Sequence, residues 1–514
     1  MSTLIVNVNE NSFDYDIHSL IKAFYPETDV KVIDSSLKES SDEGLPDIFI
    51  EIYPEKILIS YVLDKDIRVN KIETEGFSRP EVKSALKQLI YRTISDSTGK
   101  ELPWGTLTGI RPTKIPMGML NEGVEKELIC TYMKDTYLLS DEKMELAIDI
   151  AEREQNLLKK IDYENGYSLY IGIPFCPTTC LYCSFTSFPI CAYRDKADLY
   201  LDALIKELEF TATQFKGKNP DTIYIGGGTP TTLSPALLEK LLGRVSALFD
   251  IPSLFEFTVE AGRADSITEE KLRVLRKYGV NRISVNPQTM NQKTLDLIGR
   301  RHTVEDVIEA FNLARKMGFE NINMDIILGL PGEEEKDVRI TIDEISKLRP
   351  DSLTVHSLAV KRASKLSEWI KENGIKMLKN TDETMKIASE GAMSMGMNPY
   401  YLYRQKNMSG NFENVGYSAH GKEGIYNILI MEEVQTIVAC GAGTVTKRVF
   451  PEGRIERCDD VKDVNLYIEK IDEMIERKKK LFAEEGVDFP ENEGKSNSHK
   501  AHMLLHTEHK LEGF

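Results

Sequence analysis

Short apolar runs alternate with amphipathic segments between residues 167 and 358, and this alternation constrains the fold more than any other feature of the chain. We predict strands at Ser168–Ile173, Thr222–Ile225, Phe255–Val259, Arg282–Val285, Ile322–Ile327 and Ser352–Val355. Most are followed by a helical pattern, for example at Leu199–Phe215, Pro235–Leu248 and Glu333–Leu348. Successive strands joined in this way pair in parallel through right-handed crossovers. Because six strands are too few to close an eight-fold barrel, the sequence predicts an open, partial (βα)6 barrel of the α/β class.

The segments that flank this region have other patterns and predict further domains. The predicted divisions are residues 1–160, an α+β N-terminal extension; 161–375, the barrel core; 376–484, a mixed, mostly helical C-terminal domain; and 485–514, a polar tail. In the N-terminal extension we expect two strands and a helix, at Ile48–Tyr53, Lys56–Val62 and Pro80–Ser95. In the C-terminal domain we expect a strand pair and helices at Asp382–Met395 and Asp463–Glu484.

Two stretches outside the core could be taken for ligand sites. The first, Leu107–Lys114 (LTGIRPTK), lacks the Gly-Lys-Ser/Thr ending of a phosphate-binding loop, so we interpret it as a turn or an interdomain contact. The second is the polar tail, whose histidines are His499, His502, His506 and His509. They are spaced to share one face of a helix, which would suit a heme or metal handoff. We favour a solvated, disordered tail, because polar chain ends are usually disordered.

Composition and charge exclude several classes of protein. The formal net charge of −17 argues against non-specific nucleic-acid binding, which requires a positive face. The sequence has no apolar run long enough to cross a bilayer, and its start does not resemble a secretory leader. We therefore expect a cytoplasmic protein. Seven cysteines in 514 residues are sparse and odd in number, which disfavours a disulfide framework.

Three of these cysteines, Cys176, Cys180 and Cys183, form a CxxxCxxC arrangement on one loop after the first predicted strand. A structural zinc site would require a fourth Cys or His at ligand spacing, and none follows. Three clustered thiolates fit a [4Fe–4S] cluster in which one iron stays open to a non-protein ligand. Cys191 lies within reach of the loop but is not expected to bind. We interpret the others as buried and unreactive: Cys130, Cys440 and Cys458.

Polar and glycine residues follow the next four predicted strands. Gly226–Pro230 (GGGTP) follows the second strand, and adjacent glycines allow a ligand to approach the backbone closely. Glu260 ends the third strand, Gln288 lies just past the fourth, and Asp325 is within the fifth. Each alone could be a satisfied structural group. Polar groups on successive strand ends are costly to bury unless they are used, so together they predict a ligand pocket.

Five motifs in this region resemble those of oxygen-independent coproporphyrinogen III oxidases and their relatives in the radical S-adenosylmethionine (SAM) superfamily. They are YxGIPFCxxxCxYC at Tyr170–Cys183, GGGTPT at Gly226–Thr231, RISVNPQTMN at Arg282–Asn291, IGRRHT at Ile298–Thr303 and MDIILGLPGE at Met324–Glu333. The resemblance spans about residues 167–375 and continues more weakly beyond. The N-terminal extension, including Leu107–Lys114, resembles the extended coproporphyrinogen dehydrogenase branch of low-GC Gram-positive bacteria.

The resemblance implies a radical SAM barrel that holds a [4Fe–4S] cluster on Cys176, Cys180 and Cys183. It also implies two SAM molecules. Tyr170 and Glu260 are implied at the first SAM, and Gly227, Gly228 and Thr229 are implied to line the SAM sites. Residues implied at the second are Tyr182, Gln288, Arg300, Asp325, Ala359 and Val445. The residues expected to serve catalysis are Tyr170, Glu260, Gln288 and Arg300.

The activity implied by the resemblance is the oxidative decarboxylation of coproporphyrinogen III to protoporphyrinogen IX in heme biosynthesis. Such an oxidoreductase takes electrons from a reduced flavodoxin or ferredoxin. The propionates of the porphyrinogen substrate need cationic partners, and guanidinium pairs well with carboxylate. The candidate cations are Arg301, Lys361, Arg362 and Arg404.

One departure from the family pattern keeps a second function open. The oxidases carry a fourth cysteine two residues after the third, and Phe185 stands at that position here. This CxF form is typical of the heme-chaperone branch, which binds and transfers heme. A third class, a non-catalytic iron–sulfur electron carrier, would not need the glycine edge, Glu260 and Arg300 together. We favour the dehydrogenase because of the N-terminal extension.

Overall fold

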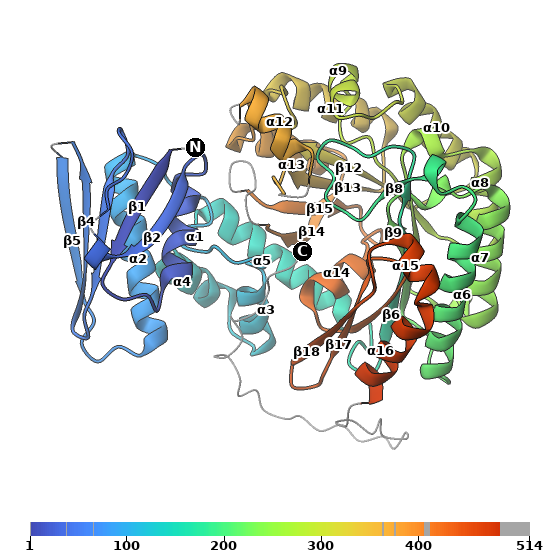
Figure 1. Ribbon diagram of the computed structural model, residues 1–514, viewed down its shortest axis with the longest axis horizontal. Coiled ribbons are helices and arrows are strands. Elements are labelled where there is room, and N and C mark those ends of the chain that lie inside the picture. The colour runs from blue at the N-terminus through green and yellow to red at the C-terminus, as the bar shows by residue number, and fades with distance from the viewer. Residues whose placement is uncertain are drawn as a thin grey trace.

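The computed structural model of the protein describes residues 2–37, 39–64, 66–361, 364–374, 377–405 and 412–483. The chain forms a small N-terminal sheet with its helices and a larger α/β body, which lie side by side in Figure 1. Arg362, the tail 485–514 and its four histidines lie outside the described residues, so the predictions made for them are untested.

The N-terminal unit is a five-stranded sheet in the order β2-β1-β3-β4-β5, counted over the described residues. Its strands are β1 (Thr3–Val8), β2 (Asp29–Asp34), β3 (Asp47–Ile52), β4 (Lys56–Leu63) and β5 (Asp66–Glu73). Its helices are α1 (Asp14–Phe24) and α2 (Arg79–Thr98). A capping box between Ser78 and Glu81 starts α2, and left-handed Gly99 ends it. The predicted strand pair and helix are therefore confirmed.

The larger body contains the predicted barrel. Six strands pair in parallel in chain order: β6 (Tyr167–Ile173), β9 (Thr222–Gly227), β10 (Glu256–Gly262), β11 (Arg282–Val285), β12 (Ile322–Leu328) and β13 (Ser352–Ser357). The helices between them are α6 (Ala197–Gln214), α7 (Pro235–Leu248), α8 (Glu269–Lys277), α9 (Gln292–Leu297), α10 (Val304–Lys316) and α11 (Glu335–Leu348). Helices α6, α7, α8 and α10 form an outer row around the strands in Figure 1. The partial (βα)6 architecture is confirmed.

The C-terminal segment extends the barrel sheet at both edges. Beyond β13 lie two antiparallel strands, and beyond β6 lie three more: β14 (Asn398–Tyr403), β15 (Asn414–Ser418), β16 (Thr436–Cys440), β17 (Val445–Val449) and β18 (Ile455–Asp459). Over the described residues the sheet thus has eleven strands, and the segment contributes more strand than the sequence predicts.

The remaining helices cover the edges of this sheet. They are α12 (Leu366–Asn373), α13 (Asp382–Ser394), α14 (Ile425–Glu432), α15 (Val464–Glu469) and α16 (Ile471–Ala483). The single helix predicted at Asp463–Glu484 was wrong, because the chain breaks between α15 and α16. The break lets Tyr467 of α15 and Lys478 of α16 both donate to the buried carboxylate of Glu207.

Helices α3 (Lys114–Asn121), α4 (Lys126–Tyr137) and α5 (Asp141–Leu158) connect the N-terminal sheet to the barrel. The N-terminal sheet has its own core between Leu4 and Leu102, whereas Trp104 and the following helices share the barrel core. How the chain divides into folding domains stays a prediction.

The stretch Leu107–Lys114 makes the contact between these parts. Arg404 donates to the carbonyl of Leu107 at 2.6 Å, and Arg111 donates to Glu433 at 2.9 Å. Just before the stretch, the indole of Trp104 donates to Glu413 at 2.7 Å. The stretch therefore contacts the C-terminal segment, and its role as an interdomain contact stays a prediction together with the domain division.

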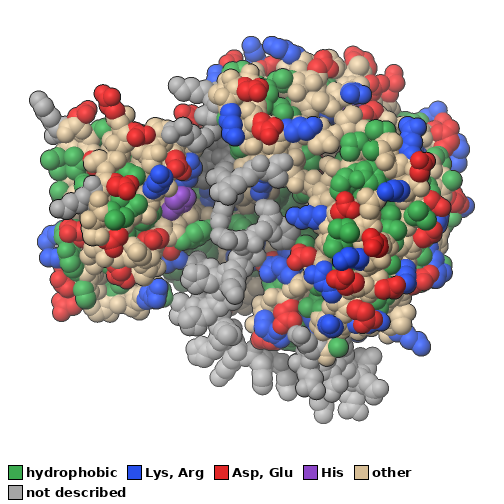
Figure 2. All heavy atoms as spheres, viewed as in Figure 1, with side chains coloured by type: hydrophobic (Ala, Val, Ile, Leu, Met, Phe, Trp, Pro, Cys, Tyr) green, Lys and Arg blue, Asp and Glu red, His purple; other side chains and the backbone are tan. Residues whose placement is uncertain are grey.

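The surface in Figure 2 carries acidic and basic side chains interspersed over both parts, rather than one continuous patch of either charge. Over the part of the chain that the structure describes, no helix is long and apolar enough to span a membrane.

Candidate iron–sulfur and S-adenosylmethionine site

The three cysteines lie on the loop that follows β6. Cys176 is in the two-residue strand β7 (Phe175–Cys176), which pairs with β8 (Phe188–Pro189). Burial, together with the nearby thiols of Cys183 and Cys180, raises the pKa of Cys176 to about 11. Burial also raises the pKa of Cys183, again with a contribution from Cys180. The three thiols therefore face one another closely enough to interact.

The donor set fits a cluster rather than a single ion. Among the described residues, no group of three or more Cys, His, Asp or Glu side chains is arranged to hold one metal ion. A cube of four irons takes one thiolate at each ligated iron, so its ligands need not converge on a single point. Cys191 is exposed, Cys440 and Cys458 are buried as predicted, and Cys130 is partly buried.

The glycine edge at the end of β9 is locked against the cysteine loop. Gly228 N–H donates to the carbonyl of Ile173 at 2.8 Å, and Thr229 N–H donates to that of Phe175 at 2.7 Å. A Cβ on Gly228 would lie 2.6 Å from the Phe175 oxygen and 3.0 Å from the Cys176 sulfur. Any side chain there would push the first cysteine away, so this position requires glycine.

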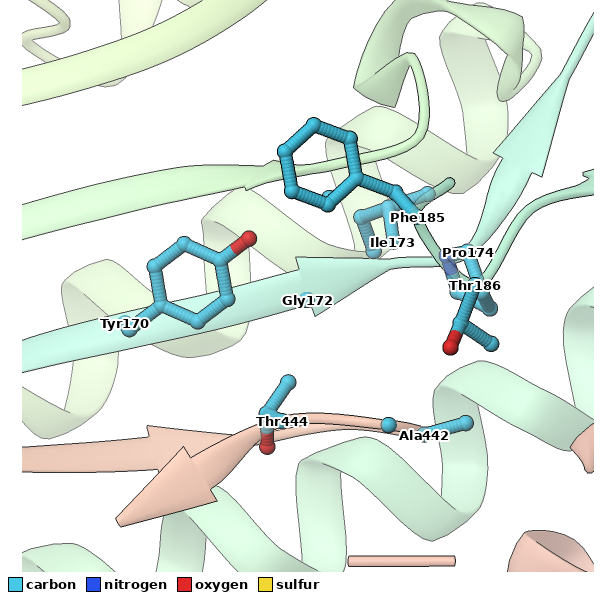
Figure 3. Close-up of a pocket in the computed structure, with 10 residues that line it drawn as sticks. Tyr170, Gly172, Ile173, Pro174, Phe185, Thr186, Ala442 and Thr444 are labelled. Atoms are coloured by element: carbon cyan, nitrogen blue, oxygen red, sulfur yellow. The ribbon is translucent and has the colours of Figure 1, made fainter. Parts of the chain in front are cut away.

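A small cavity of about 80 Å³ opens beside this edge (Figure 3). Its walls come from four segments: Tyr170 and Gly172–Pro174, Phe185 and Thr186, Gly227, and Ala442–Thr444. In Figure 3 the Tyr170 hydroxyl points towards the side on which the Phe185 ring lies. Phe185 is 76% exposed. Val445 begins β17 and does not line the cavity, although the three residues before it do.

Glu260 lies behind the glycine edge. Its carboxylate accepts a hydrogen bond from the Tyr224 hydroxyl at 2.6 Å, and a Cβ on Gly226 would lie 3.0 Å from it. Burial, together with the charge of Asp325, raises the pKa of Glu260 to about 7. A cationic ligand beside this carboxyl group would lower its pKa, because a nearby positive charge favours the ionised form.

Stacked tyrosine rings form an apolar wall next to Glu260. The ring of Tyr224 is 4.5 Å from that of Tyr426 and 6.0 Å from that of Tyr170, measured between centroids. Tyr426 is in α14, whose first N–H group is held by Glu256 at 2.5 Å. The sequence analysis missed Tyr224 and Tyr426, because nothing in their spacing shows that α14 closes this end of the barrel.

A second group of polar side chains surrounds Gln288 and Asp325. Gln288 has a left-handed φ of 67° and is held by backbone hydrogen bonds on both sides, to Asp325 and from Ile327, each at 2.9 Å. Its buried Oε1 has no hydrogen-bond partner among the described residues. A strained backbone with an unsatisfied side-chain acceptor makes Gln288 a candidate for ligand contact, as the sequence predicts.

Asp325 keeps its negative charge in this group. Burial would raise its pKa, but His356 and the amide of Asn323 outweigh burial and lower it. The His356 Nε2 lies 3.9 Å from the Asp325 carboxylate, and Tyr403 lies 3.5 Å from the other ring nitrogen. The sequence analysis did not single out His356, because an isolated strand histidine has no distinctive signal.

Arg300 connects this group to the cysteine loop. Its guanidinium donates to the carbonyl of Asn286 and, at 3.2 Å, to the Tyr182 hydroxyl, while its Nε has no partner among the described residues. Burial alone would lower its pKa, but Tyr182 and Cys180 raise it. Ala359 is partly exposed and lies two residues past the end of β13.

The three candidate partners for propionate within the described residues differ in position. Arg301 is exposed, and Lys361 is partly buried, which lowers its pKa. Arg404 is buried and donates to the carbonyl of Leu107 at 2.6 Å, and its pairing with a propionate stays a prediction.

Comparison with known proteins agrees with this geometry. The family model of the radical SAM superfamily matches residues 170–345. The oxygen-independent coproporphyrinogen-III oxidase-like protein HemZ of Bacillus subtilis (strain 168) is 41% identical over 415 residues, which cover 80% of this chain and 82% of that protein. The chain therefore belongs to the radical SAM superfamily, in the family of oxygen-independent coproporphyrinogen-III oxidase-like proteins.

Two further relatives match the core over shorter lengths. The heme chaperone HemW of Bacillus subtilis (strain 168) is 41% identical over 194 residues, 38% of this chain and 50% of that protein. The oxygen-independent coproporphyrinogen III oxidase of Escherichia coli (strain K12) is 33% identical over 196 residues, 38% of this chain and 42% of that protein. The superfamily implies a [4Fe–4S] cluster and SAM, and the names of these relatives include both an oxidase and a heme chaperone.

Proposed function

We propose that the protein is an oxygen-independent coproporphyrinogen dehydrogenase, which converts coproporphyrinogen III to protoporphyrinogen IX. The observation that carries the proposal is a pair of unsatisfied buried atoms, Gln288 Oε1 in the segment after β11 and Arg300 Nε in the segment after α9. Such atoms are costly unless a ligand satisfies them. Both residues follow β11 in the chain, whereas Glu260 belongs to β10, which supports a proposal of two separate SAM positions.

In this proposal Cys176, Cys180 and Cys183 hold the cluster, and the glycine edge with Glu260 holds SAM. Together, the bound cluster and SAM supply the one-electron chemistry that removes a hydrogen atom from an unactivated carbon. The Glu260 carboxylate pairs with the ammonium group of SAM, which keeps the carboxylate ionised at neutral pH. The tyrosine wall excludes water from the same space.

The second polar group binds and orients a second SAM molecule. The ionised Asp325, fixed by Asn323 at 2.7 Å, accepts from a cationic or hydroxyl group. Gln288 Oε1 accepts a further hydrogen bond, and Arg300 Nε donates one. These roles follow the family resemblance, and the unsatisfied atoms support them.

The substrate is a tetrapyrrole with propionate side chains. Each converted propionate loses one hydrogen atom, one electron and carbon dioxide, and becomes a vinyl group. The electron passes to an external acceptor, and a reduced flavodoxin or ferredoxin supplies the electrons that SAM cleavage consumes. Arg301 and Lys361 are the candidate partners of the propionates, because both have some exposure.

Heme binding and transfer is the second candidate function. Phe185 favours it, because this residue replaces the oxidases' fourth cysteine and exposes its ring at the cavity. An exposed apolar ring suits contact with a flat macrocycle.

The two candidates are separated by one anaerobic assay of the reconstituted full chain with coproporphyrinogen III, SAM and dithionite. The dehydrogenase forms protoporphyrinogen IX, and the Cys183→Ala variant forms none. Stoichiometric heme binding without a vinyl product, under conditions in which a known oxidase turns over, would overturn the proposal in favour of the chaperone.

A further inference from the structure

Arg263 is a buried cation next to the cysteine loop. It lies in none of the five family motifs. It follows β10, three residues after Glu260, and its side chain is 4% exposed. The guanidinium forms a two-point ion pair with Asp265, with Nε–Oδ1 at 3.0 Å and Nη2–Oδ2 at 2.6 Å. This pairing fixes the plane of the guanidinium and the direction of its remaining nitrogen.

The remaining nitrogen faces the cysteine loop. Arg263 Nη1 donates to the Thr178 hydroxyl at 2.6 Å and to the Thr178 carbonyl at 3.2 Å, and it lies 3.9 Å from the Cys180 sulfur. Thr178 in turn donates to the carbonyl of Gly299 at 3.0 Å. The loop between the first two cysteines is therefore tied to the ends of two barrel segments through one side chain.

The Asp265 carboxylate also has a neighbour in His302. The ring of His302 is fully buried, and its Nδ1 lies 3.8 Å from the Asp265 carboxylate. Burial would raise the pKa of Asp265, but His302 and Arg263 hold it well below its usual range. Asp265 therefore stays ionised, and its charge partly compensates that of Arg263.

We propose that Arg263 is a positioning residue that fixes the cysteine loop and places a permanent positive charge beside Cys180, which favours the reduced state of a cluster held there. Reduction adds one negative charge to a cluster, and a nearby cation in a buried site stabilises that added charge. Arginine keeps its charge at any working pH. The inference rests on the proposed cluster ligands and adds a residue that sets the cluster's reduction potential.

Substitutions at Arg263 and at Asp265 should shift the reduction potential of the cluster in opposite directions. Arg263→Gln removes the positive charge, so the cluster should become harder to reduce. Asp265→Asn keeps Arg263 and removes the compensating negative charge, so the cluster should become easier to reduce. Arg263→Lys keeps the charge but loses the two-point pairing, so it should retain most of the potential and bind iron less completely. Arg273→Gln, an exposed arginine on α8, is the matched control for the loss of one positive charge.

The measurement is an EPR-monitored redox titration of each reconstituted full-length variant, with iron content determined on the same sample and without substrate. For Arg263→Gln we expect at least a tenfold shift of the reduction equilibrium towards the oxidised state, which is about 59 mV for one electron. Arg273→Gln should match the unmodified protein. Asp265→Asn should shift the potential in the positive direction, which tests the inference even if Arg263→Gln binds no iron.

An unchanged potential in fully loaded Arg263→Gln, or a negative shift in Asp265→Asn, would overturn the inference. Equal shifts in Arg263→Lys and Arg263→Gln would also overturn it, because charge would then not be the cause. If the unmodified chain assembles no [4Fe–4S] cluster, it is the proposed function that fails.

Discussion

Lys478 and Arg300 are both buried cations, but they differ in how many of their own donor groups have acceptors. All three hydrogens of the Lys478 ammonium have acceptors: Glu207, the carbonyl of Ala439 at 2.6 Å, and Asp460 at 2.8 Å. Arg300 leaves Nε without a partner among the described residues, and nearby Gln288 leaves Oε1 without one. The donors of Lys478 are all used within the fold, whereas Arg300 and Gln288 each keep an atom that a ligand could satisfy.

The carboxylates that pair with Lys478 also hold the loop beside the candidate SAM site. Glu207 accepts the N–H of Gly441 at 2.9 Å, and the hydroxyl of Thr444 donates to Asp460 at 2.9 Å. The loop between these residues lines the cavity beside Tyr170. The C-terminal helix α16 is therefore part of what positions the candidate SAM site.

The largest effect is expected from removing the Lys478 ammonium from its contacts with Glu207 and Asp460. Lys478→Met leaves two carboxylates buried without their cation, which should lower the free energy of unfolding by about 3–5 kcal/mol. Denaturant titration followed by circular dichroism measures the change. Lys479→Met, at an exposed neighbouring lysine, is the control and should change little. A loss below about 1 kcal/mol in Lys478→Met would show that the network is not structural.

A second effect is expected at the ligand-binding carboxylate. Glu260→Ala should weaken SAM binding by about 1.5–3 kcal/mol, on the order of tenfold to a hundredfold in Kd, and leave iron content near normal. Equilibrium binding of SAM to the reconstituted protein measures the change, with exposed Glu270→Ala as the control. Equal SAM affinity in both variants would remove Glu260 from the binding site.

A third effect concerns a buried carboxyl group away from the site. Glu154 on α5 is fully buried, neither of its oxygens has a hydrogen-bond partner among the described residues, and burial followed by the charge of Glu432 raises its pKa. A raised pKa means that the folded state favours the neutral acid, so unfolding free energy is lost as pH rises above the ordinary value of 4.5.

Glu154→Gln should therefore stabilise the protein at pH 8 and have little effect at pH 4. Thermal unfolding at the two pH values measures the difference. Destabilisation of the variant at pH 8 would mean that the Glu154 carboxylate is ionised and paired in the folded protein, which would contradict the prediction.

The smallest effect on stability is expected at Gln288. Gln288→Asn keeps a residue that tolerates the left-handed backbone, but its shorter side chain withdraws the unsatisfied amide. We expect the unfolding free energy to change by less than about 0.5 kcal/mol, while turnover falls at least tenfold. A large loss of stability with unchanged turnover would place Gln288 in the fold rather than in the site.

The sequence predicts the barrel and the positions of its strand-end residues well. Strand β11 and helix α7 begin and end where the sequence places them. Strands β9 and β10 continue further than predicted at their carboxyl ends. Both finish with glycines, which have low strand propensity, so the sequence pattern ends before the strand does.

The rest of the site depends on contacts between distant segments. Lys478 is 271 residues from Glu207 in the chain, and a lysine in a charged helix has the pattern of a solvated face. Arg263 and Asp265 have the pattern of an ordinary surface pair until the cysteine loop is seen against them. The spacing of residues in the sequence does not indicate which buried polar groups find hydrogen-bond partners in the folded protein.

The central claim is that this site decarboxylates a porphyrinogen, and the most direct measurement is the carbon dioxide released per porphyrin product. The reconstituted chain is incubated without oxygen with SAM, a reductant, an electron acceptor and coproporphyrinogen III labelled in its propionate carboxyl groups. We predict two labelled carbon dioxide molecules for each protoporphyrinogen IX and none from the Cys180→Ala variant. Tight heme binding with no labelled carbon dioxide, while a known oxidase releases it in parallel, would contradict the account.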